Sequence, residues 1–463
     1  MSANFLHGVE TIELEQGYRS IRQVKTAVIG LIGTAYLGTP NEITLISSER
    51  IAAQTFGAVS ASAGATIPQA FNAIYDQGGA ILIAVNVLDK AKHFSTATES
   101  LTAGSLVILK NQHVFDLKIT DDQGAEITEY TLDATLGTVS GLENGKTFEF
   151  NYSYLDASKV TAADIIGETT ADGKRTGLQA LENAYPTLGF DAKIIIAPQF
   201  CEKAEVATEM IAMAEKLRAV ALIDAPAGLT FQQALAARGS ESNFNTSSER
   251  AILCYPHCVA YDTATGENVT EPLSQRLAGV ICAVDDEKGY WFSPSNNEIN
   301  GIVGMEIPIS ARVNDANSEA NLLNEQGIVT IFNSYGSGYK VWGNRTAAWP
   351  TDTGVKNFIN IRRVADVIHE SLEYSMVQFL DQPINEALID SICESVNSFM
   401  RTLVARGAIV DGACTFDASK NEASEIALGH LTFDLTFMPP TPCERISFES
   451  YIDINLLSNL NAE

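Results

Sequence analysis

The feature that most constrains the fold is a repeated alternation of short apolar runs with helical patterns. The runs are TAVIGLIGTA (26–35), AILIAVNVL (80–88), AKIIIAPQF (192–200), RAVALIDAP (218–226) and AILCYPHCVAY (251–261). Between them, apolar residues recur at spacings of three and four, as in the Val206, Met210, Met213 and Leu217 stripe. Strands that alternate with helices predict a mainly parallel sheet covered by helices.

This pattern is interrupted between residues 91 and 159. The runs SLVILK, VFDLKIT, AEITEYTLDATL and KTFEFNYSYL are short, alternate between apolar and polar residues, and are separated by turns. They predict a small all-β domain over 91–159, inserted into an α/β middle domain made of residues 26–90 and 160–265.

A third composition begins near residue 266. Loops rich in Asn, Ser and Gly precede a strand at GIVTIFNS, a hairpin whose turn is GSG, and two long amphipathic helices, the second ending at Gly407. We expect a C-terminal α+β core domain over 266–445. The helix stripes are Val364, Val367, Ile368, Leu372, Met376 and Phe379, then Leu388, Ile392, Val396, Phe399 and Leu403.

Both ends of the chain carry strand-like alternation. VETIELEQ places Ile12 and Leu14 on one face, and HLTFDLTF (430–437) is followed by RISFESYIDINLL, which places its apolar residues on one face. Chain ends usually fray, so this pattern favours strands that join a sheet. Pairing within the chain and pairing with another chain are both compatible with it. The C-terminal face comprises Ile446, Phe448, Ile452 and Ile454.

Charge and apolar runs exclude several classes of partner. The 57 acidic and 30 basic residues give a formal net charge of -27 at pH 7, which disfavours binding to nucleic acid. No run approaches the roughly 18 apolar residues that a membrane helix needs, and the first residues do not resemble an export signal, so we expect no direct membrane insertion. The 7 scattered cysteines are typical of a reducing compartment.

The motifs do not predict catalysis, a cofactor or a metal. AVIGLIGTA has Val28 where a dinucleotide-binding fingerprint needs glycine, so Gly30 and Gly33 are interpreted as a tight strand exit. GLENGKT (141–147) is one residue too short for a phosphate loop and indicates a hairpin turn. Cys254 and Cys258, interpreted as lying on one strand, are too far apart for a disulfide and lack further zinc ligands.

Few polar residues suggest a reactive or charged site. His369 lies on a predicted helix, where Asp366 and Glu370 are interpreted as solvated neighbours. The concentrated basic feature is formed by Arg345, Arg362 and Arg363. It predicts either a surface for an acidic protein partner or an ordinary solvated helix start.

Two segments resemble a known family. FLHGVETIELEQGYRSIRQVKTAVIGLIGTA near the start, and GYKVWGNRT followed by FINIRRVADVIHESLEYSMVQF, are similar to the tail sheath proteins of contractile-tailed bacteriophages and R-type bacteriocins. The resemblance is strongest in the first 35 residues and over 325–460, and it agrees in architecture elsewhere. The additional 91–159 segment favours a phage tail over a bacteriocin.

The resemblance implies a structural role without a cofactor. Sheath subunits stack as hexameric rings around an inner tube, in contact with the tail tube, baseplate and tail terminator proteins, and contract to drive the tube through the bacterial envelope for genome delivery. The location implied is the virion tail, assembled in the host bacterial cytoplasm. The alternatives are the sheath of an R-type bacteriocin or an extracellular contractile injection particle, and, from another class, a cytoplasmic α/β nucleotide-using enzyme.

The resemblance also assigns roles to residues. It implies that residues 1–25 form an N-terminal strand arm joining the C-terminal core domain, that 446–463 form a C-terminal strand arm, and that neighbouring subunits accept these strands. Ile12, Leu14, Ile446, Phe448, Ile452 and Ile454 are then the residues of strand exchange. Arg345, Arg362 and Arg363 are the expected contacts with the inner tube.

Overall fold

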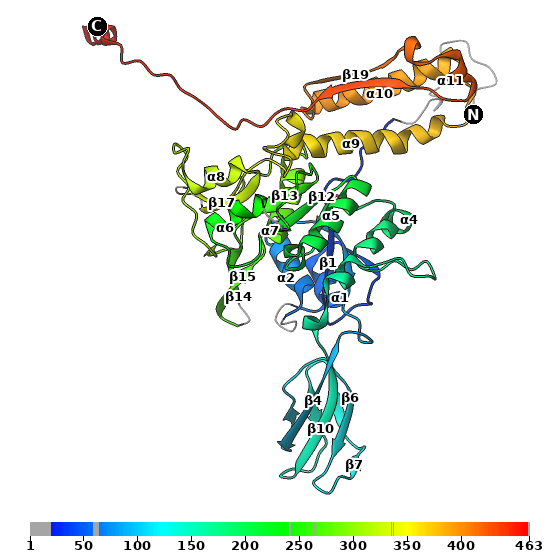
Figure 1. Cartoon of the computed structure of the whole chain (residues 1–463), viewed down its shortest axis with the longest axis vertical. Coiled ribbons are helices and arrows are strands. Elements are labelled where there is room, and N and C mark those ends of the chain that lie inside the picture. Colours follow the sequence, from blue (N-terminus) through cyan, green and yellow to red (C-terminus); the bar gives the residue numbers. More distant parts are fainter. Residues whose placement is uncertain are drawn as a thin grey trace, which may run out of the picture.

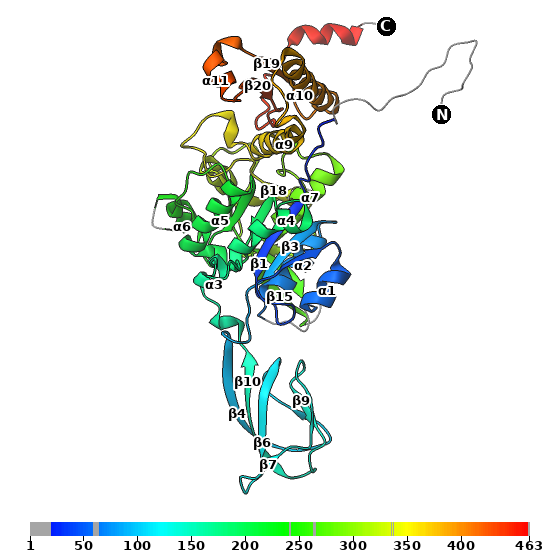
Figure 2. The same ribbon diagram turned by 90° about the vertical axis from the view of Figure 1, so that its right-hand side faces the viewer.

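The structure, a computed structural model, describes residues 20–58, 64–239, 242–262, 265–334, 336 and 338–461. Ile12 and Leu14 of the predicted N-terminal strand lie outside the described residues. A central α/β unit connects a β insert at one end of the molecule to a C-terminal unit of helices and a hairpin at the other (Figures 1 and 2). No helix in the described ranges is both long and apolar enough to cross a membrane.

The central unit is built on an eight-stranded sheet in the order β18-β17-β13-β12-β11-β1-β3-β2. The strands from β17 to β3 are parallel to one another, and antiparallel β18 and β2 form the edges. Each of the five apolar runs contributes a parallel strand, as predicted. The bounds are β1 Val28–Gly33, β2 Ile43–Ile46, β3 Ile81–Asn86, β11 Ile194–Ile196, β12 Val220–Asp224, β13 Ala251–Cys254, β17 Ile328–Ser334 and β18 Gly338–Trp342.

Helices cover both faces of this sheet because its central strands are apolar on both sides. Ile29 and Leu31 of β1 pack toward α1 (Glu49–Phe56), α2 (Thr66–Tyr75) and α7 (Leu273–Glu287). Val28 and Ile32 pack toward the opposite layer. That layer contains α3 (Ala162–Ile166), the 3-10 helix η3 (Gly177–Asn183), α4 (Ala184–Leu188) and α5 (Ala204–Lys216).

Gly30 and Gly33 lie inside β1, and Gly30 is therefore not part of the predicted strand exit. A Cβ on Gly30 would lie 2.9 Å from the Ala192 Cβ, and one on Gly33 would lie 2.2 Å from the Thr66 hydroxyl oxygen. The glycines thus allow neighbouring segments to approach the sheet closely.

The single strand predicted over 251–261 is wrong, because β13 ends at Cys254 and a second strand, β14 (Cys258–Asp262), begins after Pro256. Proline has no N–H for a ladder and interrupts the pairing. β14 leaves the central sheet and pairs with β15 (Glu267–Glu271) and β16 (Gly304–Met305). Cys254 and Cys258 consequently lie in two different sheets.

The predicted start of the C-terminal unit at residue 266 also differs from the structure. β17 pairs in parallel with β13 through Leu253 and Ile328, so the β17–β18 hairpin belongs to the central sheet. α7 and α8 (Glu319–Glu325) pack on the same unit. Ile328, Val329 and Ile331 are buried there, which explains why the hairpin joins the larger sheet.

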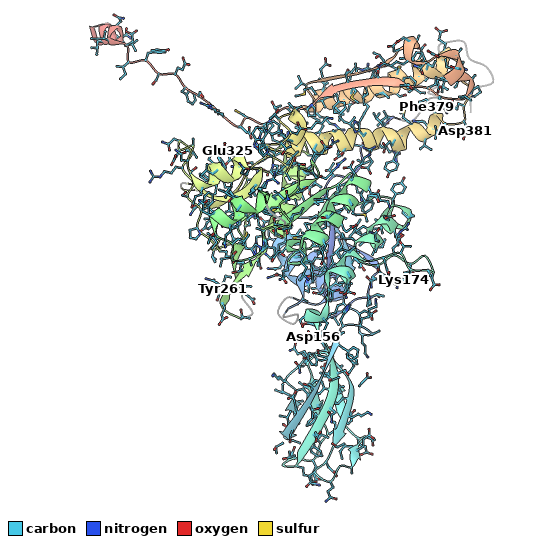
Figure 3. The ribbon with its side chains drawn as sticks, viewed as in Figure 1. Asp156, Lys174, Tyr261, Glu325, Phe379 and Asp381 are labelled. Carbon is cyan, nitrogen blue, oxygen red and sulfur yellow. The ribbon has the colours of Figure 1, made fainter. Side chains whose placement is uncertain are left out.

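The β insert consists of two small antiparallel sheets, β4-β10-β6-β7 and β5-β9-β8. Alternate residues of β10, including Phe148 and Phe150, fill its core. Its two ends meet at a neck, where the Asp156 N–H donates to the His93 carbonyl (3.1 Å); Asp156 is labelled in Figure 3. The strands are β4 Phe94–Thr102, β5 Val107–Ile108, β6 Val114–Thr120, β7 Glu126–Ile127, β8 Thr131–Asp133, β9 Thr138–Ser140 and β10 Thr147–Leu155.

The C-terminal unit contains α9 (Ile359–Met376), α10 (Glu386–Arg406), β19 (Asp411–Phe416), the short α11 (Ala423–Ala427) and β20 (Phe433–Met438). Gly407 ends α10 in the left-handed conformation (φ 81°), as its sequence position predicted. The helix stripes form the core of the unit, in which Val364, Val396 and Phe399 are buried.

Candidate assembly site

The hairpin of β19 and β20 is a two-stranded sheet whose outer edges have no strand partner among the described residues. Its register runs from Asp411 opposite Met438 to Phe416 opposite Phe433. Leu435 and Phe437 pack toward α9 and α10, as the alternation of this segment predicted. The edges of the hairpin therefore retain backbone groups that can pair with further strands.

The chain beyond the hairpin forms an extended arm, defined here as residues 439–461. Residues 439–453 contain no helix or strand, and Ile454–Asn461 form a 3-10 helix, so the strand predicted for RISFESYIDINLL is absent from the described chain. The physical reason is that a strand needs a partner, and the arm extends away from the rest of the molecule (Figure 1).

The arm exposes the apolar side chains that were predicted to exchange between subunits. Phe448 is 90% exposed and Ile452 is 105% exposed, which is unusual for large apolar residues in a folded protein. Ile446 and Ile454 are also exposed. Their exchange with a neighbouring chain stays a prediction.

Arg345 holds the root of the arm. Its guanidinium lies 4.0 Å from the Trp349 ring and 4.2 Å from the Phe358 ring, and its Nη1 donates to Asn357 Oδ1 (2.7 Å). Its Nε donates to Glu444 Oε1 (2.8 Å), and the second oxygen of Glu444 accepts from Nη2. Arg345 thus binds the arm where it leaves the C-terminal unit.

The other two predicted tube-contact residues are buried. Arg362 donates to Glu249 (2.7 Å) and Asp366 (2.9 Å), and Arg363 donates to both carboxylate oxygens of Asp285 (2.6 and 2.7 Å). Arg362 is 7% exposed and Arg363 is 6% exposed. The expected basic surface and the expected solvated helix start are therefore both wrong, because these cations neutralise acids within the chain. Contact of Arg345, Arg362 and Arg363 with a tube stays a prediction.

Further ion pairs join α9 to the central unit. Lys193 Nζ lies 2.7 and 2.6 Å from the two oxygens of Glu370, and Arg250 binds Asp366. Burial raises the pKa of Glu370, an effect that Lys193 opposes. The prediction that Asp366 and Glu370 are solvated is wrong, since both are buried at this junction.

His369 lies at the same junction and is partly buried. Its pKa is lowered by burial and by the positive charges of Arg218 and Arg362. Lys193 and Arg250 are partners of Glu370 and Asp366 that were not predicted from the sequence. The signal available for them was a charged residue directly beside a buried apolar run.

The chain before β1 passes along α9. The Arg22 N–H donates to Ser375 Oγ (3.3 Å), and the Val24 N–H donates to Ser371 Oγ (3.2 Å). Ile21 packs on the same apolar cluster as the C-terminal helices. The roots of both chain ends therefore lie in the C-terminal unit.

No arrangement of polar residues in the described ranges indicates a catalytic, phosphate-binding or metal site. GLENGKT forms the connection between β9 and β10, where Gly145 adopts a positive φ of 81°. The described residues contain no group of three or more His, Cys, Asp or Glu side chains placed to hold a metal ion. The structural features that require explanation are thus the arm and the open hairpin.

Comparisons with known proteins agree along the whole chain. The family model for the phage tail sheath protein central domain matches residues 159–347, and that for the phage tail sheath C-terminal domain matches 351–453. The chain is 48% identical to the tail sheath protein of Burkholderia phage BcepMu, over 99% of each chain. It is 26% identical to the tail sheath protein of Escherichia phage P2, over 99% of this chain and 98% of that protein.

Solved structures share the fold at lower identity. The contracted sheath complex of the extracellular contractile injection system PVC matches with a TM-score of 0.63 and 15% identity, over 98% of this chain and 99% of that chain. The contracted helical sheath of the anti-feeding prophage matches with a TM-score of 0.63 and 17% identity, over 97% of this chain and 100% of that chain.

Proposed function

Because this chain belongs to the phage tail sheath protein family, we propose that its copies join through their exposed arms into stacked hexameric rings around an inner tube. The protein is a structural subunit of a contractile tail sheath and is not an enzyme. It is part of the virion tail.

The observation that carries the proposal is that the arm and the hairpin of one chain both lack a strand partner among the described residues. The arm has an apolar face, with Phe448 and Ile452 almost fully exposed, and no strand partner in the described residues. In the part of the chain that the structure describes, the β19–β20 hairpin has open edges and no third strand. We infer that the arm of one copy adds to the hairpin of a neighbour, which satisfies both backbones and buries the apolar face.

The second hairpin edge is assigned to the N-terminal arm. The root of that arm, near Arg22 and Val24, lies against α9 in the same unit as the hairpin. Ile12 and Leu14 would supply the apolar face of its strand. Each subunit would then donate two strands and accept two, and the sheath would be a connected network.

Contraction would follow from this connection. An extended sheath would be a kinetically trapped state, released by a baseplate signal, and the linked strands would transmit the change from ring to ring. The energy would come from interfaces that improve on contraction. The tube, the baseplate and a tail terminator are the proposed partners, with assembly in the host bacterial cytoplasm and genome delivery through the envelope as the outcome.

Contact of Arg345, Arg362 and Arg363 with the tube stays a prediction, and it depends on whether their ion pairs can open. Each guanidinium has a carboxylate partner in its own chain, so direct binding to a tube would require at least one of these ion pairs to open. Exposed residues of the C-terminal unit could contact the tube without that cost.

The first experiment removes the arm after Arg445. This cut retains the Arg345–Glu444 ion pair, so the root of the arm stays in place. We expect the full-length chain to form hollow tubes in negative-stain electron microscopy and the truncated chain to stay dispersed at the same concentrations. Tubes of normal length from the truncated chain would contradict the proposal.

A pair of point variants separates the apolar face from the arm itself. Phe448→Asp places a charge on the apolar face, whereas Ser447→Asp places the same charge on the other face of the same strand. We expect the first to abolish tube formation and the second to retain it. Equal behaviour of the two variants would argue against strand addition in this register.

The sheath of an R-type bacteriocin or an extracellular injection particle is the second candidate, because sheaths of injection systems share this fold. Purified native particles distinguish the two. Capsid protein and packaged DNA in the particle fraction would support the phage tail, and their absence from intact contractile particles would support the alternative.

A further inference from the structure

Two cysteines lie where α10 packs against the hairpin. Cys393 lies on α10 and Cys414 on β19, and these elements lie side by side in both views (Figures 1 and 2). Cys414 belongs to the buried apolar cluster of the C-terminal unit, and Cys393 packs against that cluster. Neither of these cysteines lies on the exposed arm.

Asn397 fixes the position of this pair. Its Nδ2 donates to the Cys414 carbonyl (3.0 Å), and its Oδ1 accepts from the Cys414 N–H (2.8 Å). Since Cys393 precedes Asn397 by one helical turn, both lie on the α10 face that meets β19. The backbone of Cys414 is therefore held against α10 within one helical turn of Cys393.

Solvent access distinguishes this pair from the other cysteines. Cys201, Cys254, Cys258 and Cys282 are fully buried, and Cys443 lies alone and exposed on the arm. Cys393 is partly exposed and lines an open groove together with Ile389, Asp390, Thr415 and Phe416. A small oxidant can thus reach Cys393, whereas Cys414 is only 5% exposed.

We propose that Cys393 and Cys414 are a redox pair that forms a disulfide joining α10 to β19 when the chain meets a disulfide oxidant. The Cys393 thiolate attacks one sulfur of glutathione disulfide, breaking its S–S bond and releasing one glutathione thiolate. The Cys414 thiolate then attacks the Cys393 sulfur and releases the second glutathione. Two cysteine thiols are oxidised, one glutathione disulfide is reduced to two thiols, and the cysteine protons pass to solvent or to the released glutathione.

The order of attack follows from burial. Burial raises the pKa of Cys414 to about 11, and it also raises the pKa of the more exposed Cys393. Because the thiolate is the attacking species, the reaction is expected to be faster in alkaline buffer than at neutral pH.

The bond would have a structural consequence. It would fix β19, whose edge is proposed to accept a neighbour's strand, to the longest helix of the unit. This consequence rests on the proposed function, whereas formation of the bond does not. A reduced chain inside a cell and an oxidised chain in a released particle would then differ in how firmly the hairpin is held.

The test uses full-length protein carrying Cys443→Ser, which removes the exposed thiol that could link two chains. The reduced protein is incubated with glutathione disulfide at alkaline pH, and thiols are counted in denaturant before and after. We expect the loss of two thiols per chain, no retained glutathione, and a linked pair of peptides containing residues 393 and 414.

Single substitutions in the same background identify the order of events. With Cys414→Ala, glutathione should stay attached to Cys393 as a trapped mixed disulfide, and with Cys393→Ala, neither glutathione nor an internal bond should appear. Circular dichroism of each reduced variant checks that the fold is retained.

An unchanged thiol count in the Cys443→Ser protein, or glutathione retained on Cys393 although Cys414 is present, would overturn the proposal. Electron microscopy of the same samples measures tube formation separately. Failure of the redox pair is therefore distinguishable from failure of assembly.

Discussion

At the scale of single residues, the junction between α9 and the central unit depends on buried ions that are neutralised in pairs. The side chain of Asp285 is 2% exposed, and both of its carboxylate oxygens accept from Arg363. Removing one partner of such a pair leaves the other charge buried and uncompensated, which costs far more than the net contribution of the intact pair.

We predict that Arg363→Met lowers the free energy of unfolding by about 3–5 kcal/mol. Denaturant unfolding of the truncated, non-polymerising chain measures the loss. Arg401→Met is the matched control, because Arg401 and its partner Glu394 are both exposed and such pairs contribute little. Equal effects of the two variants would show that burial of the Arg363 pair has no energetic importance.

A second prediction concerns Asp224, a fully buried carboxylate at the end of β12. It accepts the Ser274 N–H (2.8 Å) and the Cys201 thiol (3.3 Å), and burial nevertheless raises its pKa. Because the pKa of Asp224 is higher in the folded chain than in the unfolded chain, its contribution to the free energy of unfolding is fully present below about pH 4. This contribution is lost as pH rises through the raised pKa.

Asp224→Asn should therefore remove one pH-dependent contribution to the free energy of unfolding. We expect the melting temperature of the wild-type chain to fall relative to that of the variant as pH rises from about 4 toward neutrality. The exposed Asp381, near the far end of α9 (Figure 3), provides the control Asp381→Asn, which makes the same substitution away from the buried site. A difference between wild type and Asp224→Asn that does not change with pH would contradict the prediction.

The sequence predicted that Arg362 and Arg363 lie at the start of a helix, but it did not predict their ion-pair partners. Arg362 and Arg363 begin a predicted helix, yet their partners Glu249 and Asp285 come from separate segments whose proximity no local pattern records. The alternation of Phe448 and Ile452 with polar residues does mark an apolar face that is exposed in the structure, and the exchange of this face between subunits stays a prediction.

At the scale of elements, the β insert is attached to the central unit at a single neck. The Asp156 N–H donates to the His93 carbonyl (3.1 Å), and Tyr36 stacks on His113 with ring centroids 4.3 Å apart. Since the two ends of the insert are adjacent, its removal requires only a short connection.

We predict that replacing residues 94–155 by a short Gly-Ser linker leaves a folded chain that still forms tubes. The insert has its own core around Phe148 and Phe150, and the assembly elements lie at the opposite end of the molecule. Circular dichroism and electron microscopy check folding and assembly. A folded deletion variant that fails to form tubes would show that the insert participates in assembly.

Elements with a clear apolar pattern were predictable, and those that depend on a partner were not. The continuous apolar run in β1 predicts a buried parallel strand because both faces are covered. The segment containing Pro256 was misread as one strand, since apolar content concealed the break in hydrogen bonding. The arm alternates like a strand but has no partner within the described chain, so pattern alone could not determine its conformation.

At the scale of the whole molecule, assembly must overcome a formal net charge of -27 per chain. Copies with this charge repel one another, and salt screens the repulsion over about 10 Å at 0.1 M ionic strength. Strand addition, by contrast, depends on backbone hydrogen bonds and apolar burial, which salt does not weaken in this way.

We therefore predict that tube formation becomes faster as ionic strength rises from low to moderate values at neutral pH. Light scattering measures the rate, and the chain truncated after Arg445 serves as the control that should show no rise. Slower assembly with added salt would indicate that attraction between charged surfaces, and not strand addition, drives polymerisation.

The placement of the two arm roots determines how force would pass through an assembled sheath. The C-terminal arm is held at Pro440, whose carbonyl accepts from Asn360 (3.1 Å), and the N-terminal arm is held at Arg22, whose N–H donates to Ser375. These anchors lie near opposite ends of α9, separated by about 22 Å of helix at about 1.5 Å per residue. Tension between neighbouring subunits would then run along the axis of one helix. The sheath would then change its height and width by rotation of the subunits about their strand connections, as a lattice of hinged rods does, while each α9 keeps its length.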